Sequence, residues 1–130
     1  HDTDILTEYV RTGMKRAISG RYFATGDGVK NEVVTLDQRV EQEIMASVKQ
    51  TEAGAYLTLD PERIRKIMEA AKVEVQKLED IGRNPIVLCS PIVRLYFKKI
   101  ADDYFDDLVV LSYNEVEPNV VVESIGSIMA

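Results

Sequence analysis

Two short, almost unbroken apolar runs constrain the fold of this chain more than any other feature. They are Pro85–Cys89 and Val109–Tyr113. A strand that is apolar at every position is covered on both of its faces, which is the pattern of a parallel sheet packed between helices. The segment between the two runs begins with Ser90-Pro91, a capping residue followed by a proline, and this order predicts the start of a helix. The runs therefore indicate a sheet with helices on its faces.

Helices and strands alternate along most of the chain. Asp60-Pro61 is the clearest helix start, and Asp37 and Ser90 are further predicted N-caps. We expect strands over residues 32–36, 55–59, 85–89, 109–113 and 120–125, the last at a sheet edge, and helices over 38–50, 61–81 and 90–105. The predicted fold class is α/β: a small layered domain with a mostly parallel mixed sheet flanked by helices, plus one extra N-terminal helix.

The extra helix spans residues 3–23, and Asp2, Thr3 or Asp4 can cap its start. Its apolar residues, among them Leu6, Val10 and Met14, recur every three or four positions and form one stripe. No strand accompanies this helix. We therefore assign residues 1–25 to the terminal helix of a preceding subdomain and residues 26–130 to a C-terminal α/β subdomain. On this assignment the α/β core covers the stripe only in part.

The charged residues are unevenly distributed along the 130 residues. The net charge is −6, and every Lys and Arg lies at or before Lys99. An acidic chain lacks the basic face that general nucleic-acid binders need, so we expect no nucleic-acid partner. A solvated rim explains the acids after Lys99, but they also form a candidate protein-interaction surface. The candidate residues are Asp102, Asp103, Asp106, Asp107, Glu115 and Glu117.

The sequence offers little for catalysis. One Cys and one His cannot supply a zinc site, and the aspartates lack calcium-loop spacing, so we expect no metal and no cofactor. We assign His1 no role. Cys89 precedes a predicted helix, where a thiol can be activated, and Arg94 follows it. The alternative function is thus a small cysteine-dependent phosphatase or phosphotransfer domain, although Pro91 removes one amide that a phosphate loop needs. A buried structural cysteine is the simpler interpretation.

Three stretches resemble the carboxyl-terminal end of the FlhA family, whose members are large membrane proteins of the bacterial flagellar type III export gate. They are Gly54–Pro61, Pro85–Arg94 (P-I-V-L-C-S-P-I-V-R) and Leu108–Pro118 (L-V-V-L-S-Y-N-E-V-E-P). The resemblance runs from about Asp4 to Ser127. Val116 stands where the family often has isoleucine, and the paired aspartates lie on a helix that in the family is usually basic.

The resemblance implies a part of a larger protein. A full-length relative carries a multi-span membrane domain followed by a cytoplasmic region, so this chain is expected at the cytoplasmic face of the bacterial inner membrane, reaching the membrane only through the absent N-terminal half. The implied function is non-catalytic: docking of substrates and chaperones and ring assembly for flagellar protein secretion. The implied partners are other export-apparatus subunits, export chaperones, cargo and further copies of the chain in a homo-oligomeric ring. The chaperone cleft belongs to earlier subdomains, so no binding residue is carried over. A third possibility is a fragment that only closes the apolar face of its neighbour.

Overall fold

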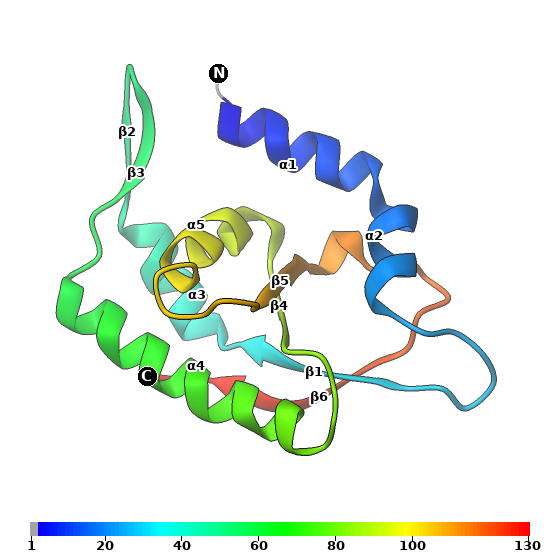
Figure 1. The fold of residues 1–130 in the computed structure, drawn as a ribbon. Helices are drawn as coiled ribbons and strands as arrows, with labels where there is room; N and C mark the ends of the chain where they lie inside the picture. Colours follow the sequence, from blue (N-terminus) through cyan, green and yellow to red (C-terminus); the bar gives the residue numbers. More distant parts are fainter. Residues whose placement is uncertain (1–2) are drawn as a thin grey trace.

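The computed structural model describes residues 3–130 (Figure 1). His1 and Asp2, one of the candidate caps, lie outside the described residues. The helices are α1 (Thr3–Gly13), α2 (Lys15–Tyr22), α3 (Gln38–Ala46), α4 (Pro61–Asp80), α5 (Pro91–Ala101) and the 3-10 turn η1 (Tyr113–Glu115). The strands are β1 (Asn31–Leu36), β2 (Val48–Thr51), β3 (Gly54–Leu57), β4 (Ile86–Cys89), β5 (Val109–Ser112) and β6 (Val122–Ile128).

Four strands form one sheet in the order β5-β4-β1-β6. All three neighbouring pairs in this sheet are parallel, and β6 carries one extra residue, Ile125, between two of its pairings with β1. The two strands predicted from unbroken apolar runs, β4 and β5, are neighbours. β6 lies at one edge of the sheet, as predicted for residues 120–125, and β5 lies at the other. The α/β fold class is confirmed.

Helices cover the sheet because alternate side chains of each strand point to opposite faces. On one face, Val34 and Val87 join the core formed with α3, α4 and α5. On the other face, Val33 and Leu88 pack with Phe23, next to the end of α2, and with residues of the connection between η1 and β6. The two apolar clusters thus join three layers, with the sheet in the middle and helices on either side of it (Figure 1).

A hairpin replaces the end of one predicted helix. The helix predicted over residues 38–50 ends at Ala46, and β2 and β3 pair antiparallel, with Val48 opposite Leu57. The prediction that Val48 lies on a helix is therefore wrong. Gly54 starts β3 with a φ of 119°, a conformation that favours glycine and allows the tight turn. The hairpin projects away from the four-stranded sheet (Figure 1).

Two further predictions about the helices need correction. The helix predicted over residues 3–23 is divided at Met14, directly after Gly13, so that α1 and α2 follow one another at an angle (Figure 1). Ser90 occupies the N-cap position of α5, but its side chain makes no capping hydrogen bond. Asp37 and Asp60 do cap, since their carboxylates accept hydrogen bonds from the backbone N–H of Arg39 and Glu62, respectively.

Candidate functional site

The six candidate acidic residues do not form one surface. Asp102, Asp103, Asp106 and Asp107 are exposed and precede β5 at the end of α5, whereas Glu115 and Glu117 follow β5. A four-residue strand extends over roughly 13 Å, so the two groups lie at opposite ends of β5. Glu115 is only 1% exposed, and its assignment to an interaction surface is therefore wrong.

Glu115 is buried because three donors surround its carboxylate. Arg11 on α1 donates from Nε to Oε2 at 2.7 Å and from Nη2 to Oε1 at 3.2 Å. The backbone N–H of Ser112 donates to Oε1 at 2.9 Å, which fixes the carboxylate at the end of β5. A buried carboxylate is tolerated where paired and hydrogen-bonded in this way. Glu115 thus joins the first helix to the sheet edge.

Arg94 on α5 lies within the same group of charges. It is 5% exposed, and its Nε is 3.3 Å from Oε1 of Glu8 and 3.8 Å from Oε1 of Glu115. Burial lowers the pKa of the Arg94 guanidinium, and the positive charge of Arg11 acts in the same direction. Burial also raises the pKa of Glu8 above its usual 4.5, although Arg94 and Arg11 oppose that shift. We call Glu8, Arg11, Arg94 and Glu115 the buried charge cluster.

The buried charge cluster is one of several polar contacts that hold α1 and α2 against the rest of the chain. Lys99 contacts Asp4 at 3.0 Å near the start of α1. Ser19 on α2 donates from Oγ to the carbonyl oxygen of Glu115 at 2.7 Å and accepts from the backbone N–H of Glu117 at 2.9 Å. Sequence reasoning missed these partners. Nothing local marks Arg11 as the partner of Glu115, which lies 104 positions away.

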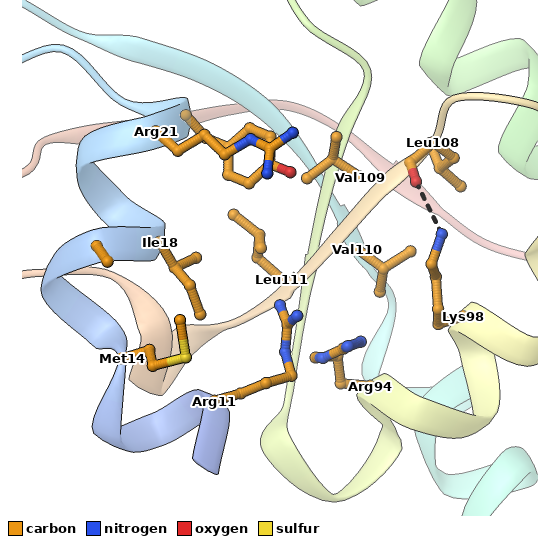
Figure 2. A pocket seen from close by; sticks show the side chains of 12 residues that line it. Arg11, Met14, Ile18, Arg21, Arg94, Lys98, Leu108, Val109, Val110 and Leu111 are labelled. Atoms are coloured by element: carbon orange, nitrogen blue, oxygen red, sulfur yellow. Dashed lines mark hydrogen bonds between the residues drawn. The ribbon is translucent and has the colours of Figure 1, made fainter. Parts of the chain in front are cut away.

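A groove of about 370 Å³ runs between α2 and α5 along the outer edge of β5 (Figure 2). Arg11, Met14, Ile18 and Arg21 line it on the side of α1 and α2, and Arg94 and Lys98 line it on the side of α5. Leu108, Val109, Val110 and Leu111 form its floor. We call this hollow the β5-edge groove. Its lining combines aliphatic side chains with four cations and contains no Asp or Glu.

Cys89 does not have the environment of a nucleophile. Its side chain is fully buried, and Sγ lies 3.8 Å from the carbonyl oxygen of Leu111. Burial raises the pKa of the thiol, with a further contribution from the charge of Glu41, which opposes thiolate formation. Glu41 also accepts a hydrogen bond from the backbone N–H of Ser90, which places a carboxylate where a phosphate loop would bind its anion. This geometry gives no support to the phosphatase alternative.

Residues 3–130 contain neither a cluster of metal-binding side chains nor a helix that could span a membrane. No group of three or more His, Cys, Asp or Glu side chains in this range is arranged to hold a metal ion. No helix within the same range is both long enough and apolar enough to cross a membrane.

Comparison with known sequences reveals related proteins. Residues 1–121 match the FHIPEP family. The flagellar biosynthesis protein FlhA of Bacillus subtilis (strain 168) is 43% identical over 125 residues, which are 96% of this chain and 18% of that protein. The low calcium response locus protein D of Yersinia pestis is 33% identical over 95% of this chain and 17% of its own length. The chain thus spans less than a fifth of these relatives.

Solved structures share the fold over nearly the whole chain. The Chlamydia pneumoniae CdsV protein has a TM-score of 0.85 at 33% identity, covering 99% of this chain and 36% of that one. The nonameric SctV-C of EPEC has a TM-score of 0.79 at 32% identity, covering 98% of this chain and 37% of its own. These findings confirm the resemblance found in the three motifs. By sequence and by fold, the chain belongs to the FHIPEP family.

Proposed function

We propose that this chain is the carboxyl-terminal part of the cytoplasmic region of a type III export gate protein, and that it acts in flagellar protein export without catalysis. Its proposed tasks are ring assembly and the docking of export substrates and their chaperones. The relative with 43% identity is named as a flagellar biosynthesis protein, which favours the flagellar system. The cytoplasmic face of the bacterial inner membrane is the corresponding location.

The observation that carries this proposal is the exposed face of α1. No residue of α1 is buried, and Leu6, Tyr9 and Val10 are 63%, 79% and 53% exposed. The helix is nevertheless fixed in place by Asp4, Glu8 and Arg11 through ion pairs. A helix that is held by polar contacts and presents its apolar side outward fits a larger assembly that covers this side. We therefore place the subdomain boundary near residue 25, with residues 26–130 as the α/β subdomain.

Two solved structures suggest which proteins supply the surface that covers the apolar side of α1 in the assembly. SctV-C of EPEC is nonameric. The CdsV protein of Chlamydia pneumoniae was solved in complex with CdsO, and that CdsV chain has a TM-score of 0.84 to this one at 34% identity, covering 98% of this chain and 37% of its own. By analogy, we propose a homo-oligomeric ring and contacts with other export-apparatus subunits, chaperones and cargo for the protein that contains this chain.

The exposed acidic residues at the end of α5 are proposed as a contact surface for a basic partner. Asp102 is already paired with Lys98 at 2.7 Å, which leaves Asp103, Asp106 and Asp107 as exposed carboxylates near it. Exchanging Asp103, Asp106 and Asp107 together for Asn should slow export while the fold survives, because charge complementarity mainly accelerates encounter. Export at the unmodified rate would leave the solvated-rim interpretation in place.

A chimera tests the function directly. The 125 matching residues of Bacillus subtilis FlhA are replaced by the corresponding residues of this chain, and swimming and the export of flagellar subunits are measured in a strain without its own FlhA. We expect export to be restored. A chimera that accumulates in the membrane but exports nothing would contradict the proposed function.

The same chimera tests the exposed apolar stripe. Leu6→Glu combined with Val10→Glu should abolish export, because the charged side chains would prevent another surface of the assembly from packing on the stripe. Val73→Glu is the matched control, since Val73 is 60% exposed on α4 and lies outside the stripe. Equal effects of the stripe variant and the control would defeat the boundary proposal.

A further inference from the structure

The β5-edge groove follows the edge of a strand rather than one face of the sheet. Leu108, Val109, Val110 and Leu111 are consecutive, and all four line it. Alternate side chains of a strand point to opposite faces, and here Val109 and Leu111 belong to one apolar cluster while Leu108 and Val110 belong to the other. A hollow that touches all four residues must therefore lie along the strand's outer edge. β5 is the terminal strand of the sheet, so no other strand of this sheet lies on that side.

The backbone of β5 presents hydrogen-bonding groups to the groove. In a parallel pair, every second residue directs its N–H and C=O toward one neighbour. The N–H of Val109 donates to the carbonyl of Pro85 on the β4 side at 2.9 Å. The same alternation turns the backbone groups of Leu108, Val110 and Ser112 away from β4.

Two of these three outward positions are engaged by side chains. Lys98 donates from Nζ to the carbonyl oxygen of Leu108 at 3.4 Å, as Figure 2 shows. The N–H of Ser112 donates to Glu115. Between these two closed ends lies Val110, whose N–H and C=O face the groove. An open edge of this kind is where an extended peptide can add as a further strand.

The charge of the groove determines which kind of peptide would bind there. Arg11, Arg21, Arg94 and Lys98 line it without an acidic residue, in a chain whose net charge is −6. Behind the lining, Arg11 pairs with Glu115, Arg94 with Glu8 and Lys98 with Asp102, whereas Arg21 has no ion pair within residues 3–130. Among these four cations, Arg94 gives the strongest indication of an acidic ligand. It is 5% exposed, and its Nη1 has no hydrogen-bond partner among the described residues. A buried guanidinium N–H without an acceptor favours the arrival of a carboxylate.

We propose that the β5-edge groove binds an extended acidic segment of a partner protein, which adds as a strand beside β5. Its backbone hydrogen-bonds to Val110. Side chains on one side of the segment pack against Met14 and Ile18, and carboxylates contact Arg21, Arg94 and Lys98. A volume of about 370 Å³ and the aliphatic lining suit a peptide better than a small inorganic anion. The proposal does not depend on the role of the chain in export.

Synthetic peptides test the proposal on the 130-residue chain. A labelled peptide of about eight residues, alternating valine and glutamate, is long enough to follow β5 and its flanking residues. Its binding is compared with that of the valine–glutamine and valine–lysine peptides of equal length. We expect only the glutamate peptide to bind, more weakly as salt is added, and we expect it to slow hydrogen exchange of the Val110 amide.

A pair of matched variants locates the site. Arg21→Glu should weaken binding about tenfold, because one attraction becomes a repulsion. Arg16→Glu, on the same helix but outside the groove, should change binding less than about twofold. Both residues are exposed, so both variants should fold.

Four outcomes would overturn the proposal. They are equal binding of the glutamine peptide, equal loss with Arg16→Glu, unchanged exchange at Val110, and displacement of the glutamate peptide by inorganic phosphate at an equal concentration. The last would reveal a small-anion site in place of a peptide groove.

Discussion

Arg11 and Glu115 join two parts of the molecule that are 104 positions apart in the sequence. The guanidinium of Arg11 donates to both oxygens of the carboxylate, at 2.7 Å and 3.2 Å. The side chain of Arg11 is 27% exposed and that of Glu115 only 1%, so the guanidinium covers the buried carboxylate on the side of the solvent. Together with the ion pairs Glu8–Arg94 and Asp4–Lys99, this two-point ion pair orients α1, which has no buried residue of its own.

Arg11→Ala should lower the free energy of unfolding by about 2 kcal/mol, because it removes two charge-assisted hydrogen bonds from a buried carboxylate. Urea unfolding followed by circular dichroism measures the loss. Arg65→Ala is the control: Arg65 pairs with Glu62 and Glu69 at an exposed site, and its removal should change the midpoint little. An Arg11 variant as stable as the control would show that the pair contributes nothing.

Glu8→Gln should change the dependence of stability on pH. Because the pKa of Glu8 is raised in the folded state, the folded chain holds more protons than the unfolded chain just above pH 4.5. The contribution of Glu8 is therefore present at low pH and is lost as pH rises through its folded pKa. Relative to the unmodified chain, the glutamine variant should gain stability as pH rises above 4.5.

The control for this pH dependence has the opposite sign. A hydrogen bond from Arg63 lowers the pKa of Glu43, so its contribution is present above the unfolded value and is lost as pH falls. Glu43→Gln should therefore lose stability relative to the unmodified chain as pH rises toward the unfolded value of 4.5, and the difference should stay constant at higher pH. Urea midpoints at several pH values measure both variants, and parallel trends would contradict the assignment.

Asp60→Ala and Ser90→Ala should differ, although both residues precede a helix that begins with proline. Asp60 accepts a hydrogen bond from the N–H of Glu62 at 2.8 Å, and losing it should cost about 1 kcal/mol. Ser90 makes no such bond, and its backbone N–H, which alanine retains, donates to Glu41. Thermal melts should show a lower midpoint for the aspartate variant alone. A similar loss for Ser90→Ala would restore the capping role predicted from the sequence.

The thiol of Cys89 should be unreactive in the folded chain. It is fully buried at the end of β4, and burial raises its pKa. A disulfide reagent such as Ellman's should modify it only after the chain is unfolded in urea, at the rate of an ordinary exposed cysteine. Rapid modification of the folded chain would revive the phosphatase alternative.

Much of the sheet could be predicted because its signals are local. Each signal lies in or next to the element that it predicts. The apolar runs lie in β4 and β5, and the pair Asp60-Pro61 stands at the start of α4. The strand predicted over residues 55–59 corresponds to β3, but its partner β2 was missed. Lys49, Gln50 and Thr51 are exposed and carry no periodic pattern that separates a strand from the end of a helix.

The site was harder to predict because its contacts are long-range. Glu115 stands in an acidic segment, and that segment alone suggests a solvated surface. Its burial results from Arg11 and from Ser112, whose backbone N–H meets the carboxylate once η1 has formed. The edge position of β5, which creates the groove, likewise follows from the order of the strands.

The strand order also affects when the chain can fold during its synthesis. β1 is made first, yet its two partners are β4 and β6, and Leu36 of β1 pairs with Ile128. Until the ribosome has released residues 122–128, β1 lacks one neighbour and exposes an unpaired edge. Translation that stalls shortly before Ile128 would therefore leave an aggregation-prone intermediate, and a chaperone that shields β1 at this stage would improve the yield of folded protein.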